Sequence, residues 1–177
     1  GEILSYDQDI EGWGLGQGNG QGNGNGRQNG QGNSTSSTAA GPITLEEAVQ
    51  LVLDAFHNAE VEPAGQFLDI PADSSVEVVN QAAAQFRVLG CDSLVAVGGG
   101  SVLDTAKGVS MLVSHGVDDL MELMGCESMD RGNPVPFVAI PYTAETGSEA
   151  TLVAVIKNPE RKVKMEFISH FLLPDVA

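Results

Sequence analysis

Residues 94–108 read LVAVGGGSVLDTAKG, and this stretch decides the fold. The apolar run over 93–97, SLVAV, is typical of a strand buried on both faces of a parallel sheet. Three glycines and a serine follow at 98–101, and apolar residues then recur at helical spacing. A strand, a glycine-rich turn and a helix in this order predict an α/β protein.

The glycine-rich turn is also a candidate binding site. Glycines at a strand end let the backbone approach a ligand closely, and the next helix presents unpaired N–H groups that favour phosphate. Ser101 adds a hydroxyl donor. The turn is not GxGxxG, because Leu103 replaces the third glycine, and it lacks the Gly-Lys-Ser/Thr of a Walker A loop. From these four residues alone, a pyrophosphate site and a simple tight turn are both open.

Periodicity predicts further elements on both sides of this stretch. Thr44 and Glu47 form a capping-box pattern in front of one helix, and Asp73 or Ser74 can cap a second. The expected helices cover 45–58, 75–89 and 102–114, and the expected strands cover 65–70, 93–97, 137–140, 151–156 and 164–168.

The first 42 residues differ in composition from the rest. Residues 1–11 are a short mixed segment that could supply a strand but could not fold alone. Residues 12–42 are mostly Gly, Asn, Gln, Ser and Thr, so they bury too little apolar surface to offset a backbone ordering cost of roughly 1–2 kcal/mol per residue. We expect a disordered, Gly-rich linker over 12–42 and one folded domain over 43–177.

The charge balance excludes several partners. The formal net charge is −16, from 24 acidic and 8 basic residues. Nucleic acids and anionic membranes need clustered Lys and Arg, so neither is expected as a partner. A solvated turn accounts for the basic cluster at Lys157, Arg161, Lys162 and Lys164. There is no apolar segment of membrane-spanning length and no basic leader, so a cytoplasmic protein is expected.

A second motif reads AIPYTAETGSEAT over 139–151. It begins as a strand that ends at Pro141 and continues with hydroxyls, a glycine and two acids, at a position where α/β sheets bind ligands. Taken alone, it reads more simply as a polar turn leading to the next strand.

Together, the two motifs resemble the iron-containing (group III) alcohol dehydrogenases. The first resembles their cofactor loop, and the second is similar to a signature that usually reads AIPTTAGTGSEVT. KVKM at 162–165 and LLPDVA at 172–177 resemble further family landmarks. The resemblance implies a Rossmann-like parallel sheet with flanking helices, of the dehydroquinate synthase-like N-terminal type. It also implies a homo-oligomer that transfers hydride between NAD or NADP and a small alcohol or aldehyde.

The resemblance implies roles for eight residues of this sequence. Gly99, Gly100 and Ser101 would hold the pyrophosphate, and Thr143, Thr146 and Lys164 would contact the cofactor. Leu173 would line the nicotinamide or ribose region, and Asp104 would shape the site near the nicotinamide. Without the resemblance, Asp104 is a first-turn acid that complements the helix dipole.

The metal of the family, Fe²⁺ or Zn²⁺, is implied only if a C-terminal helical domain is present, since that domain supplies one Asp and three His as ligands. This chain stops at Ala177, and its own histidines, His57, His115 and His170, have no ligand spacing. No catalytic or metal-binding residue is therefore expected here, and the chain alone is expected to be inactive. The alternative is a non-catalytic binding or assembly module derived from a truncated dehydrogenase domain.

Two further departures from the family bear on the cofactor. The family has an early strand whose end carries an acid near the adenosine ribose, and the low-complexity tract stands in its place, so the choice between NAD and NADP stays open. Tyr142 and Glu145 replace a usual Thr and Gly, and a carboxylate at 145 would repel a pyrophosphate.

Overall fold

Four parallel strands form the main sheet of the computed structural model, which describes residues 43–124, 135–143 and 146–177, together with the backbone of 2–7. The strand order is β2-β1-β3-β4. The strands are β1 (Glu2–Asp7), β2 (Gly65–Ile70), β3 (Ser93–Gly98) and β4 (Phe137–Pro141). This sheet, with helices on both faces, confirms the predicted α/β fold.

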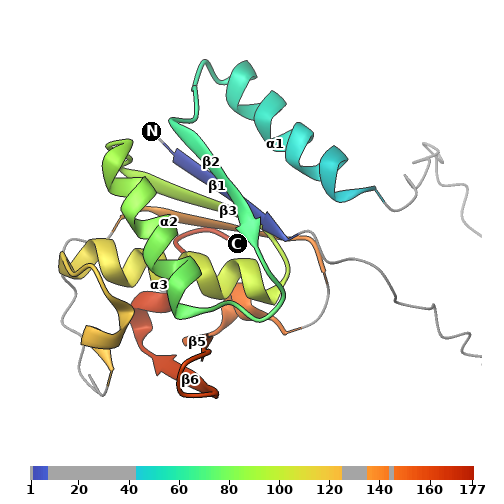
Figure 1. Ribbon diagram of the computed structural model, residues 1–177. Coiled ribbons are helices and arrows are strands. Elements are labelled where there is room, and N and C mark those ends of the chain that lie inside the picture. The colour runs from blue at the N-terminus through green and yellow to red at the C-terminus, as the bar shows by residue number, and fades with distance from the viewer. Residues whose placement is uncertain (1, 8–42, 125–134, 144–145) are drawn as a thin grey trace, which may run out of the picture.

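The helices cover the two faces of the sheet unequally. Helix α1 (Leu45–Asn58) lies on one face, and α2 (Val76–Val88) and α3 (Gly100–His115) lie on the other (Figure 1). The larger hydrophobic cluster lies on the α2–α3 side, and a smaller one joins α1 to β3. None of the helices in the described part of the chain is both long and apolar enough to cross a membrane.

Helix α3 packs closely against its neighbours because Gly108 has no side chain. A Cβ atom there would lie 2.7 Å from Val79 Cγ1 and 3.0 Å from Ile156 Cδ1. The glycine therefore lets α3 approach α2 and the strand that carries Ile156 more closely than any other residue could.

The predicted capping box is confirmed at α1. The Thr44 hydroxyl accepts from Glu47 N at 3.2 Å, and the Glu47 carboxylate accepts from Thr44 N at 2.7 Å. The predicted cap of α2 is wrong by one or two residues, because Ser75 takes this role and accepts from Val78 N. Asp73 and Ser74 are engaged elsewhere, as described below.

Strand β1 lies in the middle of the sheet, between β2 and β3. Leu4 is paired with Gln66 on one side and with Val95 on the other. The sequence left open whether residues 1–11 supply a strand, and Glu2–Asp7 does so, with Asp7 at its carboxyl end. The expected linker, residues 12–42, lies outside the described residues.

Strands β5 (Val153–Asn158) and β6 (Val163–Ile168) form a separate antiparallel sheet. Both strands were predicted, within two residues of their bounds, but neither joins the parallel sheet. The short connection over 159–162 makes the two strands antiparallel to each other, since parallel neighbours need a crossover of a dozen or more residues. The buried Ala154 and Ile156 of β5 join the cluster beneath α3.

Candidate functional site

The glycine turn lies at the carboxyl edge of the parallel sheet, where β3 ends. The N-cap of α3 is Gly99, which has no side chain to accept hydrogen bonds from the first N–H groups of the helix. The loop after β4 lies beside this turn, because Tyr142 N donates to Gly98 O at 3.0 Å. Two strand-end loops therefore meet at the start of α3.

The structure brings Thr143 and Thr146 against the glycines. A Cβ atom on Gly99 would lie 3.1 Å from Thr143 Oγ1, and one on Gly100 would lie 3.0 Å from Thr146 Oγ1. Any side chain at either glycine would press against a threonine. Four of the eight predicted site residues thus form one contiguous group, in which the two threonine hydroxyls lie beside the backbone of the two glycines.

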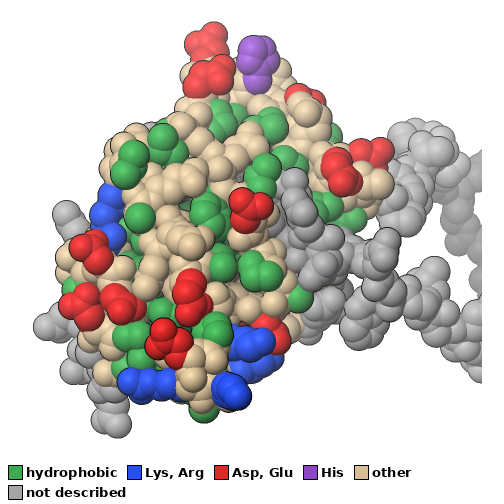
Figure 2. Space-filling view, in the orientation of Figure 1, with side chains coloured by type: hydrophobic (Ala, Val, Ile, Leu, Met, Phe, Trp, Pro, Cys, Tyr) green, Lys and Arg blue, Asp and Glu red, His purple; other side chains and the backbone are tan. Residues whose placement is uncertain are grey.

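Ser101 and Lys164 meet at a residue that was not among the predicted site residues, Asp73. The Ser101 hydroxyl accepts from Asp73 N at 3.1 Å, and Lys164 Nζ lies 2.6 Å from Asp73 Oδ1. This ammonium group lowers the pKa of Asp73 below its usual value. Lys164 belongs to the predicted basic cluster, which lies on the β5–β6 hairpin; Figure 2 shows it as the Lys and Arg side chains at the lower end of the molecule.

Asp104 faces the β5 side of α3, where both carboxylate oxygens have protein partners. Oδ1 accepts from Ser148 Oγ at 2.8 Å, and Oδ2 accepts from Val155 N at 3.0 Å. Burial raises the pKa of Asp104, although these two hydrogen bonds act in the opposite direction. The carboxylate therefore ties α3 to β5, and its proposed place near a nicotinamide stays a prediction.

Sequence reasoning missed Lys107, the largest fully buried side chain of the described residues. Its ammonium group donates to three backbone carbonyls, those of Ser148, Thr151 and Val153, at 2.7, 3.0 and 2.8 Å. Burial lowers the pKa of Lys107, while the nearby Asp104 raises it. One signal could have revealed this residue: it stands four residues from Leu103 and four from Met111, on the apolar face of the helix.

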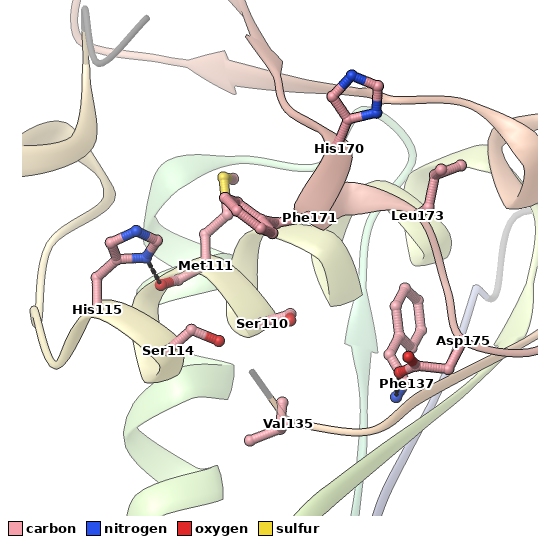
Figure 3. A pocket seen from close by; sticks show the side chains of 10 residues that line it. All are labelled: Ser110, Met111, Ser114, His115, Val135, Phe137, His170, Phe171, Leu173 and Asp175. Atoms are coloured by element: carbon pink, nitrogen blue, oxygen red, sulfur yellow. Dashed lines mark hydrogen bonds between the residues drawn. The ribbon is translucent and has the colours of Figure 1, made fainter. Parts of the chain in front are cut away.

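Leu173 lies at the other end of α3. It lines a pocket together with Met111, His115 and His170 (Figure 3). The α3 residues of this pocket begin at Ser110, roughly 14 Å along the helix from Ser101. The structure therefore does not bring Leu173 to the glycine turn, and its contact with a nicotinamide or ribose stays a prediction.

The three histidines occupy separate or non-ligating positions. His57 is on α1 with its side chain 83% exposed, and His115 Nδ1 lies 2.8 Å from Met111 O. His170 shares the pocket with His115. Over the described ranges, no group of three or more His, Cys, Asp or Glu side chains could hold a metal ion.

Of the two unusual loop residues, the structure accounts for one. The Tyr142 hydroxyl donates to Ile43 O at 2.5 Å, and the ring packs against the smaller hydrophobic cluster of α1 and β3. Tyr142 therefore links the loop after β4 to the start of α1. Glu145 lies outside the described residues.

Comparisons with known proteins give a consistent picture. A family model described as iron-containing alcohol dehydrogenase matches residues 34–177. The chain is 36% identical to 4-hydroxybutyrate dehydrogenase of Cupriavidus necator over 130 residues, which is 72% of this chain and 33% of that protein. It is 37% identical to NAD-dependent methanol dehydrogenase of Bacillus methanolicus over 132 residues, 75% of this chain and 33% of that protein.

Solved structures agree with the sequence relatives. Sulfoacetaldehyde reductase from Bifidobacterium kashiwanohense, in complex with NAD⁺, is similar with a TM-score of 0.66 and 30% identity, covering 75% of this chain and 34% of that one. A 1,3-propanediol oxidoreductase has a TM-score of 0.69 and 27% identity, covering 99% and 37%. The chain spans about a third of the length of the curated relatives it matches.

Proposed function

Because the chain belongs to the iron-containing alcohol dehydrogenase family, we propose that the start of α3 binds the pyrophosphate of NAD or NADP. One observation carries this proposal: the N-terminus of α3 has no side-chain cap and lies at the carboxyl edge of the sheet, where Thr143 and Thr146 pack directly against Gly99 and Gly100. Helix N-terminal N–H groups and their partial positive charge favour a phosphate at this position.

The surrounding side chains have complementary chemistry. Ser101, Thr143 and Thr146 can donate hydroxyl hydrogen bonds to phosphate oxygens, and Lys164 adds a positive charge. Ser101 lies in the first turn of α3, the two threonines lie against Gly99 and Gly100, and Lys164 is linked to Ser101 through Asp73. In this proposal the chain is the cofactor-binding part of an NAD(P)-dependent alcohol dehydrogenase that acts on a small alcohol or aldehyde.

The metal chemistry of such an enzyme is not assigned to the described residues, since no group of them fits a metal ion. A bound Fe²⁺ or Zn²⁺ would polarise the substrate oxygen. We propose that these 177 residues bind the cofactor and do not turn over an alcohol without further ligands for the metal.

Fluorescence titration with NADH tests the cofactor site. We expect saturable binding, weakened about ten- to hundredfold in Ser101→Ala, because a hydrogen bond to a charged oxygen contributes about 1.5–3 kcal/mol. Ser114→Ala, near the other end of α3, is the matched control and should bind as the unchanged chain does. Absence of binding at millimolar NADH would contradict the proposal and favour a non-catalytic binding or assembly module.

We further propose that NAD is preferred over NADP. Strand β1 ends at Asp7, opposite Ile70 of β2 and at the same carboxyl edge of the parallel sheet as the end of β3. This family has an acid near the adenosine ribose at such a strand end. A carboxylate there can accept from the ribose 2′-hydroxyl and repels a 2′-phosphate.

The expected result is at least about tenfold tighter binding of NADH than of NADPH, with the gap lost in Asp7→Ser. Asp69→Ser, on the exposed side of β2, removes the same charge and should leave the gap unchanged. Equal affinity of the unchanged chain for both nucleotides would show that Asp7 does not select the cofactor.

A further inference from the structure

Asp73 is the acidic residue that contacts two members of the proposed phosphate site. Its backbone N donates to Ser101 Oγ at 3.1 Å, and its carboxylate binds Lys164 Nζ at 2.6 Å. Both partners are residues that a pyrophosphate at the start of α3 would use. Because the carboxylate binds Lys164, it can compete with a phosphate for that ammonium group.

The loop that carries Asp73 is held in place from two sides. Ser74 is buried, its hydroxyl lies 2.7 Å from Thr105 Oγ1 on α3, and its carbonyl accepts from Lys157 N on β5 at 2.7 Å. Asp73 itself has φ 61°, in the left-handed region that Asp and Asn tolerate better than most residues. These contacts hold the backbone of Asp73 beside α3.

The Asp73–Lys164 pair, by contrast, can separate at little cost. Both side chains are about half exposed, at 48% and 58%, and exposed ion pairs contribute little to stability. Lys164 is long and flexible, so it can turn from the carboxylate to a phosphate while the loop stays where it is.

We propose that Asp73 is a built-in competitor of the cofactor, which occupies Lys164 in the free protein and must release it when a pyrophosphate binds. This inference rests on the proposed cofactor site and adds a residue that sets its affinity. Asp73 is in this sense an affinity-determining residue, and it has no role in hydride transfer.

The test is nucleotide binding by Asp73→Asn, in which the charge is lost while the backbone conformation is retained. NADH and inorganic pyrophosphate should each bind about three- to tenfold more tightly, and the gain should shrink at 0.5 M salt. Asp69→Asn is the control for net charge and should bind as the unchanged chain does.

A second measurement repeats the Asp73→Asn comparison in a Lys164→Ala background. If Asp73 acts through Lys164, then Asp73→Asn should have no effect in the Lys164→Ala background. An equal gain in both backgrounds would overturn the proposal, because Asp73 would then act only as a nearby negative charge. Unchanged or weaker binding by Asp73→Asn would also overturn it.

The outcomes separate this inference from the proposed function. If the unchanged chain binds NADH and Asp73→Asn does not improve binding, the cofactor site stands and the competitor role fails. If the unchanged chain fails to bind at millimolar NADH and Asp73→Asn binds, the competitor role stands and the proposed function of the unchanged chain fails. If neither protein binds either ligand, both fail.

Discussion

Replacing Lys107 with methionine is expected to lower the free energy of unfolding by about 3–5 kcal/mol. Methionine fills much of the same volume but cannot donate, so three buried or partly buried carbonyls lose their hydrogen-bond partner. Asp104 also loses the cation that offsets part of its burial. A loss of this size is a large part of the 5–15 kcal/mol that stabilises a typical domain.

Urea unfolding followed by circular dichroism measures this effect. Lys157→Met is the matched control, since Lys157 is an exposed lysine on β5 and its backbone hydrogen bond to Ser74 O does not depend on the side chain. It should change the free energy of unfolding by no more than about 0.5 kcal/mol. Equal stability of the two variants would show that the Lys107 hydrogen bonds do not hold the β5–β6 hairpin on α3.

Local signals in the sequence were sufficient for most of the fold. The Thr44–Glu47 capping box and the apolar run of β3 predict elements that the structure contains, because both are decided by residues near in sequence. Strand β1 could not be assigned in this way. Six residues followed by a low-complexity tract carry no periodicity, and their place in the sheet depends on pairing with the distant β2 and β3.

In the candidate site, too, the residues within local motifs could be predicted and those brought in by tertiary contacts could not. The family motifs contain Gly99, Gly100, Thr143 and Thr146, and the structure brings these residues together. Asp73 could not be assigned, because its contacts with Ser101 and Lys164 join residues 28 and 91 positions apart. A single acid before a helix is read most simply as a cap, and only the tertiary structure shows that Ser75 takes that role.

Lys107 shows a different limit of sequence reasoning. A lysine in a helix is ordinarily solvated, since a buried ammonium group needs several acceptors to offset the loss of water. The loop and strand that follow β4 supply those acceptors 41 to 46 residues later. The motif at 94–108 therefore has two functions. Its glycines leave the N-terminus of α3 without a side-chain cap, and Lys107 links the helix to the start of β5 by hydrogen bonds.

Gly100→Val is expected to weaken NADH binding by about 100-fold or more, the largest effect on the cofactor site. A Cβ atom at this position would lie 3.0 Å from Thr146 Oγ1, so a branched side chain would fill the space that a phosphate needs above the first turn of α3. The fold should tolerate the change. Thr146 is exposed and can rotate, and the φ of Gly100 is not in the left-handed region.

Stability and binding measured together distinguish a blocked site from an unfolded protein. Gly100→Val should keep its circular dichroism spectrum and its urea midpoint while losing NADH binding. Ser114→Val, which adds the same side chain near the other end of α3, should change neither. If Gly100→Val binds NADH normally, the pyrophosphate does not approach the start of α3, and the proposed site is wrong. If both valine variants lose binding, the effect comes from α3 as a whole and not from its N-terminus.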